Sequence, residues 1–177
     1  MQTRFRLALL IAIVGVAAFG GTVRATPTPQ DELAQVRRAT AQFHRLEAAT
    51  AAGYELGYLN GADIRIITGC IAHPTLGAMG YHYFNKALID DLVIDPLRPE
   101  GLVYAPDADG GLKLVAVEYV VPGTNSNPAG PADAPTVFGM PMHILVPAVG
   151  FHTLHAWIWS YNPSGMFAHW NPEVTCP

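Results

Sequence analysis

The sequence contains few charged residues, and positive charge is the scarcer kind. Of its 177 residues 14% are charged, with ten Lys and Arg against fourteen Asp and Glu, so the formal net charge is −4. Proteins that bind nucleic acid or anionic membrane surfaces depend on an excess of Lys and Arg. The acidic balance therefore excludes nucleic acid as an expected partner.

Serine is rare as well, and the catalytic motifs that most often identify an enzyme are missing. The only serines are Ser126, Ser160 and Ser164, and none lies in a G-x-S-x-G sequence. There is no glycine-rich phosphate-binding loop and no H-E-x-x-H helix. No reaction class follows from motifs alone.

Long apolar runs are missing too, apart from one at the N-terminus. Arg4 and Arg6 come before the apolar run 7–19, and Val23-Arg24-Ala25 places small residues where signal peptidase reads the chain. A membrane-spanning helix needs about 20 apolar residues. We therefore predict a cleaved signal peptide, residues 1–25, export to the periplasm or the medium, and no stable membrane anchor. Loss of the three arginines in this leader changes the net charge from −4 to −7.

Only two cysteines are present, Cys70 and Cys176. An even number of cysteines in an oxidising compartment indicates a disulfide, which here would join the C-terminus to the middle of the chain. In the chain-entropy model, closing a loop of about a hundred residues stabilises a fold by about 4 kcal/mol. The alternative is a thiolate metal site.

The remaining residues, 26–177, have the length of a single domain and carry one strong helix signal. Thr28-Pro29-Gln30-Asp31 combines an N-cap residue, Pro at the first helical position and Asp at the third. An apolar stripe with helical spacing follows and ends near Gly53. We predict an amphipathic helix over this stretch.

The rest of the sequence has the pattern of short strands and turns. The expected strands are 64–67, 79–84, 102–104, 112–121 and 151–160, and the turn residues 106–111 predict a hairpin of 102–104 with 112–121. Residues 122–150 are rich in Pro, Gly and Asn and predict a long irregular segment, and residues 161–177 predict a turn-rich tail. The expected fold is α+β, with the helix packed on a mostly antiparallel sheet or partial β-barrel.

Three ionisable residues are predicted to lie on apolar strand faces. Side chains two residues apart share a face, which places His82, Glu118 and His155 among apolar neighbours. A buried carboxylate needs a charged or hydrogen-bonding partner. Two imidazoles and one carboxylate are the ligand set of catalytic zinc and of non-haem iron. The sequence predicts a divalent metal site here, for zinc, iron or copper, or else a polar cluster that is structural or contacts a ligand.

Other histidines are weaker candidates. His152 lies three residues before His155, a spacing that would bring both to one side of a helix but to opposite sides of a strand. His73 follows Cys70 with two residues between them, a spacing found between metal ligands. This spacing does not indicate a metal site if Cys70 forms a disulfide.

Two further features suggest ligands of other kinds. The first is a group of tryptophans near the C-terminus, Trp157, Trp159 and Trp170, which could form the wall of a pocket for an apolar or sugar-like small molecule, or simply part of the core. The second is Met140, Met142 and His143, whose thioether and imidazole groups suit copper and which would then meet on an exposed loop. A non-enzymatic ligand-binding protein and a copper-handling protein are therefore alternatives to a metal-dependent enzyme.

Several segments resemble a family of small exported bacterial proteins of unassigned function. They are Gly69-Cys70, residues 77–83, Val117-Glu118-Tyr119, residues 154–159, residues 162–165 and residues 167–176. The similarity extends over most of residues 30–177. It implies that His82, Glu118, His155 and both cysteines belong to the family pattern, and that His73 and His152 depart from it.

Overall fold

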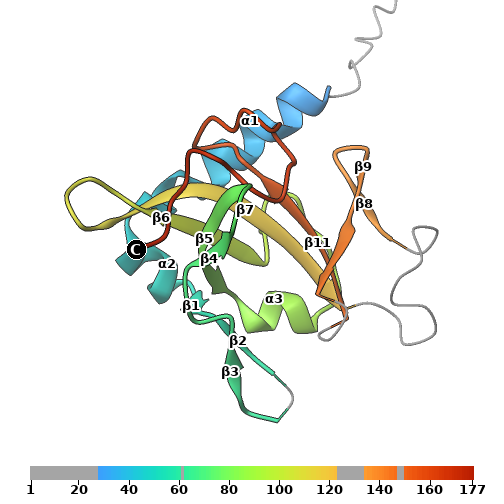
Figure 1. Ribbon diagram of the computed structural model, residues 1–177. Coiled ribbons are helices and arrows are strands. Elements are labelled where there is room, and N and C mark those ends of the chain that lie inside the picture. Colours follow the sequence, from blue (N-terminus) through green and yellow to red (C-terminus); the bar gives the residue numbers. More distant parts are fainter. Residues whose placement is uncertain (1–27, 61, 123–133, 147–149) are drawn as a thin grey trace, which may run out of the picture.

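The computed structural model describes residues 28–60, 62–122, 134–146 and 150–177 (Figure 1). The predicted signal peptide, residues 1–25, lies outside this part of the chain. Among the residues described, no helix has the length and apolar character needed to cross a bilayer.

The N-terminal helical segment begins as predicted but is not one helix. The Thr28 hydroxyl accepts from the backbone N–H of Asp31, and the Asp31 carboxylate accepts from the N–H of Thr28 at 3.0 Å. The segment then divides into α1 (Pro29–Thr40), the 3-10 helix η1 (Ala41–His44) and α2 (Leu46–Ala51). Thr40 donates to the carbonyl of Val36, a bond that weakens helix continuation, and Arg45 is extended.

A seven-stranded antiparallel sheet forms the centre of the molecule. The strand order is β1-β5-β6-β7-β11-β10, and β4 also pairs with β5. The bounds are β1 (Glu55–Leu56), β4 (Ile71–His73), β5 (Gly77–Phe84), β6 (Gly101–Pro106), β7 (Leu112–Pro122), β10 (His143–Val146) and β11 (Phe151–Ala156). Two short hairpins, β2 (Tyr58–Leu59) with β3 (Arg65–Ile66) and β8 (Thr136–Val137) with β9 (Met140–Pro141), and the helix α3 (Lys86–Asp90) complete the elements.

The predicted α+β class is confirmed, and so is the hairpin of β6 and β7. The prediction for residues 122–150 was wrong in part, because this segment contains β8, β9 and β10, and β10 pairs with β11 in the main sheet. Residues 123–133 and 147–149 lie outside the described residues. The last predicted strand is shorter than expected and ends at Ala156.

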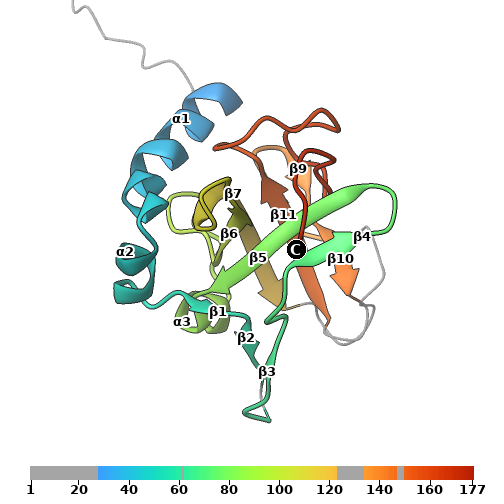
Figure 2. The ribbon, with the colours of Figure 1, turned by 60° about the vertical axis from the view of Figure 1, so that its left-hand side comes forward.

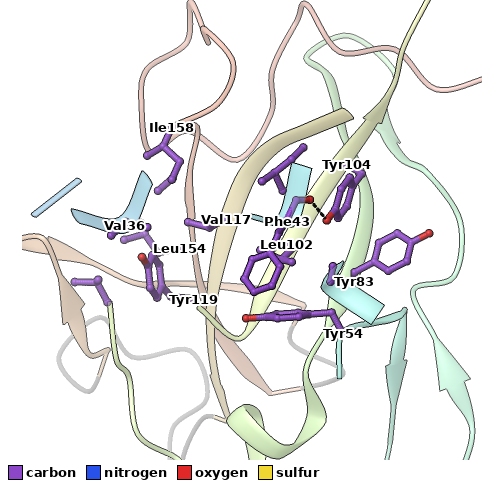
Figure 3. Close-up of a cluster of buried hydrophobic side chains, with 14 of the residues drawn as sticks. Val36, Phe43, Tyr54, Tyr83, Leu102, Tyr104, Val117, Tyr119, Leu154 and Ile158 are labelled. Carbon is purple, nitrogen blue, oxygen red and sulfur yellow. Dashed lines mark hydrogen bonds between the residues drawn. The ribbon is translucent and has the colours of Figure 1, made fainter. Parts of the chain in front are cut away.

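The helical segment covers one face of the sheet and builds the larger core cluster with it. Figure 3 shows this cluster, in which the hydroxyl of Tyr104 donates to the carbonyl of Phe43 at 2.6 Å. Tyr54 donates in the same way to the carbonyl of Pro99 at 2.7 Å. These bonds satisfy phenolic groups that would otherwise be costly to bury.

The opposite face of the sheet is covered in part by the C-terminal tail. In Figure 2, β5 crosses in front of β11, and the C-terminus lies against β5. Ala78 and Asn171 exchange two backbone hydrogen bonds, at 3.0 and 3.1 Å. Cys70 and Cys176 form the predicted disulfide, with a Cα–Cα distance of 5.7 Å. The tail is therefore fixed over the sheet at two points.

Candidate metal centre

His82, Glu118 and His155 meet on the sheet face opposite to the N-terminal helical segment, η1 and α2 included. Glu118 in β7 is directly opposite His155 in β11, and His82 lies in β5. In a flat sheet β5 and β11 would be three strand spacings apart, about 14 Å. The Nε2 atoms of His82 and His155 are nevertheless only 3.3 Å apart. The sheet must curve strongly to bring these strands together.

Small residues and an irregular register accompany this curvature. Gly80 in β5 has φ +115°, and a Cβ at this position would lie 2.4 Å from the carbonyl oxygen of Tyr104. The register of β6 and β7 shifts between Val103 and Tyr104. Such irregularities bend strands and increase their twist. Gly101 lies opposite Glu118, where a Cβ would crowd the glutamate at 3.1 Å.

The spacing of the three side chains suits a metal ion. Besides the contact between the histidines, His82 Nε2 lies 3.6 Å from Glu118 Oε2, and His155 Nε2 lies 3.8 Å from Glu118 Oε1. A tetrahedral ion with bonds of about 2.1 Å separates its ligand atoms by about 3.4 Å. The candidate ligand atoms all lie within 4.8 Å of one another, so this group could hold a metal ion.

Burial strongly disfavours charge in this site. The three residues are 2% exposed or less. Burial raises the pKa of Glu118 to about 8, with a further contribution from the carboxylate of Glu100. Burial lowers the pKa of His82 to about 4, opposed by the backbone of Gly80, and holds the pKa of His155 well below its usual range. Without an ion, burial therefore favours the neutral form of all three side chains at pH 7.

The Nε2 atoms of His82 and His155 share one hydrogen bond at 3.3 Å, and much of the remaining hydrogen-bonding capacity of the site is unused. Glu118 Oε2 and the Nδ1 atoms of His82 and His155 are buried without a hydrogen-bond partner. Contacts of 3.6 and 3.8 Å to the carboxylate are too long for hydrogen bonds. Leaving buried polar atoms unsatisfied costs about 1–3 kcal/mol each. A cation bound to the two Nε2 atoms and the carboxylate would satisfy Glu118 Oε2, although not the two Nδ1 atoms.

A cavity of about 190 Å³ adjoins the site. Most of its lining is apolar, and His82, Glu118 and Thr153 provide the polar part. His155 does not line the cavity and lies behind the other two, fully buried. An ion held by the three side chains would therefore have its remaining coordination positions directed toward an apolar space.

The predicted tryptophan group is divided in the structure. Only Trp170 lines the cavity. Trp157 is buried and stacks on His155, with ring centroids 6.1 Å apart. Trp159 packs on the helical side, where its Nε1 donates to the Thr40 hydroxyl at 3.2 Å. Because β11 ends at Ala156, the strict alternation that we assumed for residues 157–159 does not continue.

The methionine-containing segment does not present its sulfurs together. Met142 is 2% exposed and belongs to the core cluster under the helices, whereas Met140 and His143 are exposed. The expectation that all three meet on an exposed loop was therefore wrong for Met142. Met142 lies between β9 and β10 with its side chain in the core, whereas the side chain of His143, the first residue of β10, is exposed.

The other histidine candidates lie outside the group. His152 is buried in β11 and pairs with Val121, on the face opposite to His155. The Nδ1 atom of His73 accepts from the N–H groups of Thr75 and Leu76, both at 3.2 Å, and so closes the turn after β4.

Two residues near the site were missed at the sequence level. Glu100 is 1% exposed, accepts from the N–H of Val120 at 2.9 Å, and has its pKa raised to about 7 by burial. His169 lies in the tail, with its ring centroid 6.2 Å from that of His155 and 5.0 Å from that of His143. Glu100 precedes its strand by one residue and His169 lies in a turn-rich segment, so strand alternation indicates neither.

Comparison with known proteins identifies no similar protein, so any assignment of function depends on this geometry. A scan against protein-family models, a search of curated proteins and a search of solved structures each found no match.

Proposed function

We propose that the protein binds one divalent transition-metal ion through His82, Glu118 and His155. The observation that carries the proposal is a buried carboxylate surrounded by two neutral imidazoles, with no hydrogen-bond partner for its Oε2 atom. Among the described residues its only ion-pair contacts are these two histidines. Ionised Glu118 would need a compensating positive charge, and a metal ion provides it.

Zinc and ferrous iron are the candidate ions that this ligand set favours. Two histidines and one carboxylate bind catalytic zinc with an open fourth position, and the same set binds non-haem iron. An ion with open positions polarises a bound oxygen donor and lowers the pKa of bound water. The cavity supplies a partly enclosed, mostly apolar space in which such chemistry on a small molecule would take place.

The proposal is tested by measuring metal content on protein secreted by a host that cleaves signal peptides. We expect about one ion per chain in the wild type and near-complete loss in Glu118→Gln. Glutamine has nearly the shape of the protonated carboxyl, which is the form present without metal at pH 7, so this variant should fold. Plasma mass spectrometry identifies the ion and its stoichiometry.

Glu100→Gln is the matched control. Glu100 is as deeply buried as Glu118 and also has a raised pKa, but it does not belong to the ligand group. It should keep its metal. Equal metal loss in both variants, or a well-folded wild type that takes up neither zinc nor iron, would contradict the proposal.

We also propose that the chain is exported and acts after removal of residues 1–25. The disulfide between Cys70 and Cys176 supports an oxidising location. Mass spectrometry of the same secreted sample should find Thr26 as the first residue.

A further inference from the structure

The cavity beside the metal site has the size of a small ring. Its volume is about 190 Å³. An apolar protein cavity of about 150 Å³ accommodates benzene, so this one suits a molecule of about eight non-hydrogen atoms. Its apolar lining is contributed by several elements and by the tail: Ile67, Ile71, Met79, Phe84, Val120, Phe151 and Trp170.

The polar groups of the cavity come from β5, β7 and β11 of the curved sheet. Thr153 lies two residues before His155 on the same face of β11, and its Oγ1 atom is buried without a hydrogen-bond partner. Glu118 and His82 are the two ligand residues that reach the cavity. A molecule in this space would therefore meet the ion and one free hydroxyl, and otherwise mostly apolar walls.

This lining does not suit a sugar, because a sugar has many hydroxyl groups and the lining is mostly apolar. Every buried hydroxyl of a polyol needs a hydrogen-bond partner, and the lining side chains with polar groups are few: His82, Glu118, Thr153 and Trp170 with its indole N–H. Two of these would be occupied by the ion. A divalent ion with one ionised glutamate and two neutral histidines carries a net charge of +1, which favours an anionic oxygen donor on the ligand.

The backbone of Ile67 is held in an unusual conformation at the cavity. Its φ is +59°, in the left-handed region that β-branched residues rarely adopt. Ile67 is half-buried and lines the cavity together with Ile71 and Trp170, which are also half-buried. Backbone outliers of this kind concentrate at ligand-binding segments. The position is consistent with a ligand-contacting rim.

We propose that the cavity binds a mostly apolar molecule the size of a single aromatic ring, with one oxygen donor that reaches the metal ion. A phenol or a small aromatic carboxylate has this chemistry. The apolar walls enclose the ring, the ion binds the oxygen, and the Thr153 hydroxyl bonds to the same polar end. This inference rests on the proposed metal site.

The test compares 4-methylphenol with p-xylene, which has a methyl group in place of the hydroxyl and nearly the same shape. Isothermal titration calorimetry on zinc-loaded protein should show 4-methylphenol binding at least about tenfold more tightly than p-xylene. Glycerol, with three hydroxyls and no ring, should not bind. In metal-free protein the difference between the two aromatic probes should become smaller.

Two variants locate the binding. Ile71→Trp fills the cavity from the edge strand β4 and should abolish binding of both aromatic probes while zinc remains bound. Thr153→Val keeps the side-chain shape and should weaken 4-methylphenol severalfold without affecting p-xylene. Thr136→Val, on an exposed position of β8, is its matched control and should change neither.

The outcomes separate this inference from the metal proposal. Stoichiometric zinc with no binding of either aromatic probe, or glycerol bound as tightly as 4-methylphenol, would overturn the inference and leave the metal site intact. Absence of metal would overturn the proposed function and the oxygen-donor half of the inference. Binding of p-xylene to wild type but not to Ile71→Trp would then still establish the apolar half.

Discussion

At the scale of single residues, the charge of Glu118 determines what the site can bind. With a pKa raised to about 8 by burial, this carboxyl carries a proton at neutral pH when no ion is present. Burial lowers the pKa of His82 to about 4 and holds the pKa of His155 well below its usual range. Neither imidazole therefore carries an additional proton that a metal ion would have to displace. Metal binding at pH 7 therefore exchanges one proton for one ion.

We predict that this exchange is measurable. At about pH 6.5, titration with zinc should release about one proton per ion. Below the pKa of Glu118 each unit of rising pH makes deprotonation easier, so the binding constant should increase about tenfold per unit from pH 6 and level off above about pH 8. Calorimetry in two buffers of different ionisation enthalpy counts the protons. Zinc binding without proton release would mean that Glu118 is ionised in the free protein.

Strand alternation alone was sufficient to select His82, Glu118 and His155. It failed where a strand ended or its register changed. Trp159 lies beyond the end of β11 and packs on the helical side. Leu114 would share the face of Glu118 in a regular strand, but it belongs to the larger core cluster because the register of β6 and β7 shifts beside it. Neither event has a local signal in the sequence.

At the scale of elements, the site depends on how β5 is held against its neighbours and the tail. Gly77, the first residue of β5, has φ +91°, and a Cβ there would lie 2.1 Å from the carbonyl oxygen of Asn171. The adjacent Ala78 forms the two backbone bonds to Asn171. Only glycine permits the tail to approach this closely. The tail in turn places Trp170 at the cavity.

We predict that Gly77→Ala destabilises the protein by about 2–4 kcal/mol, because it combines backbone strain with displacement of the tail. Gly110→Ala is the control, since Gly110 has a similar φ of +81° but no atom within 4 Å of its would-be Cβ. That variant should lose only about 1 kcal/mol. Urea unfolding followed by tryptophan fluorescence measures both. Equal losses would show that the contact with the tail contributes nothing.

The elements themselves were predictable to different degrees. The capping box at Thr28 and the strong apolar strands of the β6–β7 hairpin were evident in the sequence. The break at Thr40 was not, because it comes from a side-chain bond to the carbonyl of Val36 rather than from a helix-breaking residue. The short strands β4 and β10 were also missed, since pairing with β5 and β11 rather than local pattern defines them.

At the scale of the whole molecule, the disulfide joins two segments that line the cavity, the start of β4 with Ile71 and the C-terminal tail with Trp170. Cys70 precedes β4, Cys176 is the penultimate residue, and 106 positions separate them. Counting cysteines and inferring an oxidising compartment predicted this bond correctly. The count did not indicate what the bond does, which is to hold the tail that carries Trp170 and Asn171 against β5.

We predict that the double variant Cys70→Ala/Cys176→Ala loses about 4 kcal/mol of unfolding free energy in the chain-entropy model. The hydrogen bonds between the central strands do not involve either cysteine, so the variant should still unfold cooperatively. The loss should be largest locally at the tail. There, the amides of Ala78 and Asn171 depend on each other for their hydrogen bonds.

Urea unfolding gives the total loss, and amide hydrogen exchange gives its distribution. Exchange at Ala78 and Asn171 should accelerate far more than exchange at Val117 in the central strand β7, because a tail without its covalent link opens without unfolding the sheet. If the tail amides stay as protected as Val117, the two hydrogen bonds and the packing of Val174 are sufficient to hold the tail in place. The disulfide would then stabilise the protein only through its unfolded state, and the enclosure of the cavity would not depend on an oxidising environment.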